Sequence, residues 1–185
     1  MNYVWYVGYG SNLLEERFLC YIKGGKFRMG GSTSKGCEDR TSPLASKPTI
    51  IPAQMYFAVN SKSWQGSAVA FICYFKLNRI DSRTTLGRMW KISEEQFEGV
   101  RHQEGRSLYN KVIELGESED GCRIVNLTRR KTFIPNKPSV QYLCTIAWRL
   151  KETFGMNNGE IKGYLKEMPG IKDTYSEEQL ISIFI

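Results

Sequence analysis

The chain has 185 residues, of which 41% are hydrophobic and 24% charged, the balance of a globular protein with one full core. No apolar run approaches the ~20 residues of a membrane-spanning helix, and the N-terminus lacks the pattern of a signal peptide. We therefore expect a single domain over residues 1–185, a cytoplasmic location and no membrane partner.

The net charge of +7 is compatible with nucleic-acid binding, but the basic residues are spread along the chain. Their one compact cluster, Arg129–Lys131, lies between two strand-like runs and is typical of a solvated hairpin tip. A modestly basic surface suits anionic small molecules equally well. We expect no nucleic-acid partner, and a basic nucleic-acid-binding domain is kept as the lesser alternative.

The cysteines are scattered, and no two of them form a CxxC pair: Cys20, Cys37, Cys73, Cys122 and Cys144. With His102 as the single histidine, the chain lacks the ligand spacing of a structural zinc site. We expect reduced thiols and no metal.

A sharp turn near the N-terminus is the first candidate site. The apolar run Val4–Val7 ends in Gly8 and Gly10, and Asn12 follows. Glycine lets the backbone turn tightly and come close to a ligand. Asn12 is a good helix N-cap, and Glu15 completes a capping-box pattern, so unpaired N–H groups would face a carboxylate or an oxyanion. The turn is either such an anion cradle or an ordinary strand-to-helix connection.

Periodicity and turn residues predict the remaining elements. Residues 13–21 carry a short helical stripe, and residues 24–47 form a long loop insertion, either a flap over a site or a segment with little order. Strands are expected at 54–59, 67–75, 86–92, 108–115, 122–128 and 140–148, and helices at 94–104, after Asn157 up to Pro169, and after Ser176. Without regular βαβ alternation, this order predicts an α+β fold, a small mixed, mostly antiparallel β-barrel with flanking helices.

The helix over 94–104 carries the second candidate site. Ser93 and Gln96 form a capping-box pattern at its start. Phe97, Val100 and Glu104 fall on one face, which places a carboxylate at the last turn of a buried face. Burial and the helix dipole would both raise the pKa of this carboxyl. Glu104 is therefore either a functional acid or a solvated residue at the rim.

Several common chemistries are not supported. The turn lacks the third glycine of a dinucleotide loop, because Leu13 stands there. Ser11 is not part of a nucleophile elbow, His102 is a poor candidate for its base, and no Walker-type loop is present. One carboxylate, a backbone cradle and no metal remain.

Three motifs, in order, resemble those of the γ-glutamylcyclotransferase-like family. Tyr9-Gly10-Ser11-Asn12 resembles the "YGSN" loop of that family, and Trp64-Gln65-Gly66 before a strand is similar to its next motif. Glu104-Gly105 followed by Tyr109 is similar to the "EG…Y" motif, in which the glutamate is catalytic. The resemblance suggests a bacterial-type member with a long insertion, and it implies the mixed barrel already expected.

The resemblance implies an enzyme that releases 5-oxoproline from a γ-glutamyl amino acid, peptide or amine. It gives Glu104 the role of general acid/base and the N–H groups of Gly10, Ser11, Asn12 and Leu13 the role of substrate binding. Tyr9 would line the pocket and Tyr109 would donate a hydrogen bond, with no cofactor. A binding module without turnover is the alternative, and the leaving group and a homodimeric state stay open.

Overall fold

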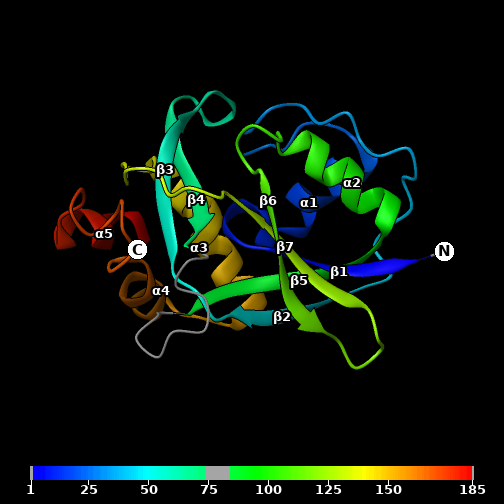
Figure 1. The fold of residues 1–185 in the computed structure, drawn as a ribbon. Helices are drawn as coiled ribbons and strands as arrows, with labels where there is room; N and C mark the ends of the chain where they lie inside the picture. Colours follow the sequence, from blue (N-terminus) through cyan, green and yellow to red (C-terminus); the bar gives the residue numbers. More distant parts are fainter. Residues whose placement is uncertain (1, 74–83, 185) are drawn as a thin grey trace.

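A computed structural model describes residues 2–73 and 84–184. Its larger sheet has five strands in the order β2 (Ala45–Ile51), β5 (Thr85–Ser93), β1 (Tyr3–Gly8), β7 (Arg123–Thr128) and β6 (Lys111–Glu117). The β1–β7 pair is parallel, and the other neighbours are antiparallel. A separate hairpin of β3 (Met55–Ser61) and β4 (Ser67–Ile72) stands beside this sheet (Figure 1). The end of the strand predicted at 67–75 lies outside the described residues.

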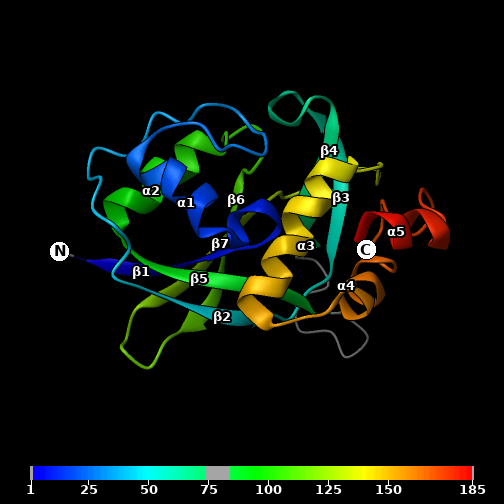
Figure 2. The same ribbon diagram turned by 180° about the vertical axis from the view of Figure 1, so that it is seen from behind.

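The helices gather in two places. α1 (Glu15–Lys23) and α2 (Glu94–Gln103) pack together near the N-terminal half of the sheet, and the segment between α1 and β2 passes over them (Figures 1 and 2). α3 (Val140–Phe154) crosses between the large sheet and the hairpin, with α4 (Asn158–Leu165) and α5 (Glu177–Phe184) beyond it. Two short 3₁₀ turns, η1 (Gly10–Leu13) and η2 (Lys62–Trp64), complete the order. No helix in the described part of the chain is long and apolar enough to cross a membrane.

The antiparallel-rich α+β architecture is confirmed, whereas the described strands form two sheets instead of the single closed barrel that we expected. A side chain links β4 to β7. The hydroxyl of Thr128 accepts a hydrogen bond from the Ile72 N–H (3.1 Å) and donates one to the Ile72 carbonyl (2.8 Å). The hydroxyl of Thr128 therefore satisfies backbone groups of β4 where the two sheets meet.

The strand predicted at 140–148 is wrong, because this segment is the first part of α3. Ser139 caps the helix by accepting a hydrogen bond from the Tyr142 N–H, and Gly155 ends it in a left-handed conformation. The buried residues Tyr142, Leu143, Ile146 and Leu150 recur at helical spacing. The segment contains aromatic and β-branched residues, which prefer strands, and tertiary packing overrides that preference.

The segment predicted as a loop over 24–47 ends in an unexpected strand, β2, on the outer edge of the sheet. Five of its seven residues are exposed, and it contains Pro48, so it lacks the alternation of a half-buried strand. The preceding loop is anchored on the helices: Gly36 N–H donates to the side chain of Gln103 (3.2 Å), and the Gln96 amide donates to the Thr41 carbonyl (2.9 Å).

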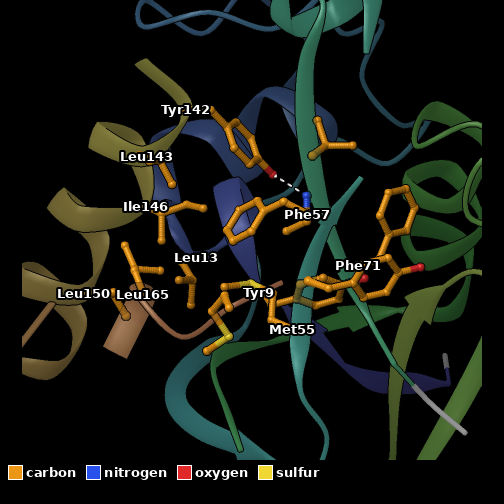
Figure 3. Close-up of a cluster of buried hydrophobic side chains, with 14 of the residues drawn as sticks. Tyr9, Leu13, Met55, Phe57, Phe71, Tyr142, Leu143, Ile146, Leu150 and Leu165 are labelled. Carbon is orange, nitrogen blue, oxygen red and sulfur yellow. Dashed lines mark hydrogen bonds between the residues drawn. The ribbon is translucent and has the colours of Figure 1, made fainter. Parts of the chain in front are cut away.

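The core has two parts. The larger joins α3 to the hairpin and the end of β1; Figure 3 shows Leu143, Ile146 and Leu150 of α3 facing Phe57, Leu13 and Met55. The smaller lies between the sheet and helices α1 and α2, where Phe18 stacks on Trp90 with ring centroids 4.8 Å apart. The candidate site lies where these two parts meet.

Candidate functional site

The turn after β1 depends on two glycines. A Cβ on Gly8 would lie 2.7 Å from the carbonyl oxygen of Asn12, so only glycine lets the turn fold back on the strand. Gly10 has φ +61°, and a Cβ there would lie 2.9 Å from the Cβ of Ala70 and 3.0 Å from the Tyr142 hydroxyl. Larger residues at either position would push the turn away from β4 and α3.

Asn12 does not cap α1 as predicted. Residues 10–13 form η1, and the helix starts two residues later, with Leu14 at the cap position and no side-chain cap. The side chain of Asn12 is 6% exposed and points into the interior, where its amide donates hydrogen bonds to the carboxylate of Glu104 and to the Tyr6 hydroxyl (3.3 Å). An apparent capping residue therefore holds a carboxylate.

Helix α2 places Glu104 as predicted. Ser93 and Gln96 form the capping box, with both hydrogen bonds present, and Phe97 and Val100 are buried on the same face. Glu104 is the C-cap residue, and its backbone N–H still bonds to the Val100 carbonyl. The backbone of Glu104 is therefore held in place by the helix, and the residue is only partly exposed.

Glu104 and the turn line one cavity, which encloses about 610 Å³ with the open space at its mouth included. The lining comes from β1, η1, α1, the hairpin, the end of α2, the segment after it, β7 and α3. Its residues are Tyr6, Tyr9, Ser11, Asn12, Arg17, Tyr21, Ser61, Ser63, Trp64, Val69, Ala70, Gln103, Glu104, Leu108, Tyr109, Leu127 and Tyr142.

Burial raises the pKa of Glu104 above its ordinary value of 4.5. The positive charge of Arg17 and hydrogen bonds from Asn12 and Tyr21 oppose this effect without cancelling it. A carboxyl in this position is held by two donors and yet takes up a proton more readily than an exposed glutamate. A carboxyl with a raised pKa is better suited to accept and return a proton than an exposed glutamate.

Tyrosine hydroxyls satisfy the backbone groups that border the cavity. Tyr9 donates to the Leu127 carbonyl (2.8 Å), and Tyr109 donates to the Ala70 carbonyl (3.0 Å). The Tyr142 hydroxyl accepts from the Ala70 N–H (3.2 Å), a contact visible in Figure 3. Burial raises the pKa of all three, so their hydroxyls stay protonated at neutral pH. The proton of Tyr109, which we expected to reach a ligand, is engaged by β4.

Of the residues predicted for the site, Tyr9, Ser11, Asn12, Glu104 and Tyr109 line this cavity. Gly10 and Leu13 are not among its lining residues. Both residues are buried, and the side chain of Leu13, which is 1% exposed, belongs to the core, as Figure 3 shows.

Several lining residues were not predicted from the sequence, namely Tyr6, Arg17, Tyr21, Trp64 and Tyr142. One signal was present: Arg17 is a charged residue within the apolar stripe of α1, where it is 4% exposed. Tyr142 was hidden by the wrong strand assignment. Trp64 packs edge-on against Tyr142, with ring centroids 4.7 Å apart, from a hairpin turn far away in sequence.

Within residues 2–73 and 84–184, no group of three or more His, Cys, Asp or Glu side chains could hold a metal ion. The five cysteines are free thiols in the structure.

No family model matches the chain. Among solved structures, it is similar to one described as a gamma-glutamyl cyclotransferase, with a TM-score of 0.60 and 22% identity over 98% of each chain. It is also similar to a structure described as uncharacterized protein loc79017 from Homo sapiens, with a TM-score of 0.62 and 22% identity over 99% of each chain. The chain therefore has the γ-glutamylcyclotransferase-like fold that its motifs predicted.

Among curated proteins, 102 residues of the chain are 34% identical to Histone deacetylase 5 of Arabidopsis thaliana. The match takes in 55% of this chain and 15% of that protein. Because the chain spans so little of that relative, the match carries no activity over to it.

Proposed function

We propose that this protein is a γ-glutamyl cyclotransferase, which converts a γ-glutamyl compound into 5-oxoproline and a free amine. One observation carries the proposal: Glu104, with its raised pKa, is held by Asn12 of the η1 turn inside one cavity. The fold, shared with a solved structure described as a gamma-glutamyl cyclotransferase, supports it.

The reaction is an intramolecular aminolysis. The α-ammonium group of the substrate first gives a proton to the Glu104 carboxylate. The neutral amine then attacks the γ-carbonyl carbon, a new C–N bond closes the five-membered lactam, and the old C–N bond breaks. Glu104 returns this proton to the departing nitrogen. The attacking nitrogen loses a second proton as it becomes the lactam N–H, and Glu104 carries this proton to the departing nitrogen as well, so the amine leaves as an ammonium ion and no water is consumed. Both reacting groups belong to one molecule, so the protein accelerates the step by holding the chain folded.

The turn supplies the electrostatic part of the proposal. N–H groups of η1 and the hydroxyl of Ser11 would receive the substrate carboxylate or the oxyanion of the tetrahedral intermediate. Tyr9 and Tyr109, fixed on β7 and β4, would form rigid walls that keep the glutamyl chain bent.

The test is an assay for 5-oxoproline with a panel of γ-glutamyl amino acids, peptides and amines. We expect release from at least one class, reduced about 10²–10⁴-fold in Glu104→Gln. Circular dichroism of the variant should match the wild type. Full activity in the folded variant would rule out the proposed role of Glu104. Binding of γ-glutamyl compounds without product would favour a binding module.

A further inference from the structure

A second hollow shares a wall with the Glu104 cavity. The two have Arg17, Tyr21, Ser63 and Gln103 in common. The rest of the second hollow consists of Ser32, Thr33, Ser34, Lys35 and His102. Its lining thus includes two cationic side chains and several hydroxyls, and it contains neither aspartate nor glutamate. Residues 32–35 belong to the loop insertion, so this segment builds one side of the hollow.

Arg17 is the buried charge between the two hollows. One terminal nitrogen donates to the Ser34 hydroxyl (3.3 Å) and the other to the Tyr21 hydroxyl (2.8 Å). The guanidinium also lies over the Tyr21 ring, 4.4 Å from its centroid. These contacts hold the group firmly. The charge of Arg17 also acts on the Glu104 carboxylate, but the two groups form no direct ion pair.

No carboxylate among the described residues lies within 4 Å of the Arg17 guanidinium, although the side chain is only 4% exposed. Its Nε is buried without a hydrogen-bond partner. A buried cation with unused donors is unfavourable until an anion pairs with it, and a carboxylate fits the planar donor face of arginine. This unsatisfied group is the observation that points to a ligand.

We infer that the second hollow is a subsite for a carboxylate on the leaving group of the substrate, with Arg17 as the recognition residue and Lys35 at its entrance. The inference rests on the proposed function. It assigns the substrate class: γ-glutamyl compounds whose departing amine carries a carboxylate, in preference to simple γ-glutamyl amines.

The position of the hollow distinguishes the two carboxylates of such a substrate. The α-carboxylate shares a carbon with the amine that reacts, so it stays beside Glu104 and η1. Neither Glu104 nor any η1 residue lines the second hollow. The leaving group extends away from the γ-carbonyl, and a carboxylate on it can cross the shared wall at Arg17.

A matched substrate pair tests the inference. γ-Glutamylethylamine is γ-glutamylalanine without the carboxylate of the leaving group. For the wild type we expect kcat/KM to be about tenfold or more higher with γ-glutamylalanine, as for a charge-assisted hydrogen bond. Arg17→Met should abolish most of that ratio, and Arg17→Lys should retain part of it. If Arg17 acted only through Glu104, Arg17→Met would lower kcat/KM equally for both substrates, and their ratio would stay unchanged.

Exposed Lys35 offers a variant that does not disturb the core. Lys35→Met should lower the ratio by about threefold, and Lys26→Met is the matched control, with the same change in an exposed lysine of the same loop outside both hollows. Equal kcat/KM for the two substrates in the wild type, or an unchanged ratio in both Arg17→Met and Lys35→Met, would overturn the subsite while cyclotransferase activity stands. Absence of 5-oxoproline from every substrate would overturn the proposed function and the subsite with it.

Discussion

At the scale of single residues, the site is a carboxylate placed among donors that do not fully stabilise its charge. Asn12, Tyr21 and Arg17 each favour ionised Glu104, and burial outweighs them. Asn12 also stabilises the turn, because its amide donates a hydrogen bond to the Tyr6 hydroxyl at the base of the turn. The proposed chemistry and the local structure therefore involve the same side chain.

The raised pKa of Glu104 makes a prediction about stability. A carboxyl whose pKa is higher in the folded state favours folding when protonated, and this contribution is lost as the pH rises through the folded-state value. The Gln side chain of Glu104→Gln stays neutral. The melting temperature of this variant, measured relative to that of the wild type, should therefore increase from pH 4 to pH 8. Thermal unfolding across this range is the measurement.

Glu119→Gln, the same change at an exposed turn, controls for the loss of one negative charge. If the advantage of Glu104→Gln shrinks as the pH rises, the pKa of Glu104 is lowered by its partners instead of raised by burial.

At the scale of elements, side-chain hydroxyls take the place of a strand ladder along β4. Tyr142 from α3, Tyr109 from the segment before β6 and Thr128 from β7 bond its backbone at Ala70 and Ile72. Tyr109 and Tyr142, which bond this backbone, also line the cavity.

Thr128→Val tests the role of this hydroxyl. The change keeps the shape of the side chain and leaves the buried N–H and carbonyl of Ile72 without Thr128 as a partner, so we expect a loss of about 2–3 kcal/mol in the free energy of unfolding. Urea denaturation measures it. Thr49→Val on the edge strand β2 is the matched control and should change stability by no more than about 0.5 kcal/mol. A loss for Thr128→Val as small as that control would show that Thr128 does not join the two sheets.

At the scale of the whole molecule, the cavity lies where the sheet, the hairpin, α2 and α3 meet, and the loop after α1 adds a wall to the adjoining hollow. A ligand in the cavity touches elements from both parts of the core. Its binding should therefore stabilise the fold as a unit.

Glu104→Gln allows this to be measured without turnover. With γ-glutamylalanine at about 100 times its Kd, binding adds about 2.7 kcal/mol, which raises the melting temperature by about 5–10 °C for a chain of this size. Free alanine is the control compound. An unchanged melting temperature at saturating γ-glutamylalanine and every other γ-glutamyl compound tested would argue against this cavity as a γ-glutamyl site.

Much of the fold was predictable where local signals agree with packing. The capping box at Ser93 and the apolar spacing of Phe97 and Val100 located α2, and with it the direction of Glu104. Prediction was wrong for α3, whose aromatic and β-branched residues prefer strands. It did not find β2, because most residues of this strand are exposed and show no alternation of apolar and polar residues. In both, contacts with distant segments decide the structure.

The sequence by itself determined the candidate residues: two glycines that force a tight turn, a capped helix that carries one carboxylate on its apolar face, and motifs that resemble one family in order. Only the tertiary structure decided that Asn12 contacts Glu104, that Arg17 is buried with its Nε unpaired, and that hydroxyls from other elements bond the backbone of β4. The physical reason is the sequence separation over which each interaction acts. Capping and periodicity act within a few residues, whereas Asn12 and Glu104 are separated by 92 positions and meet only because two parts of the core pack together.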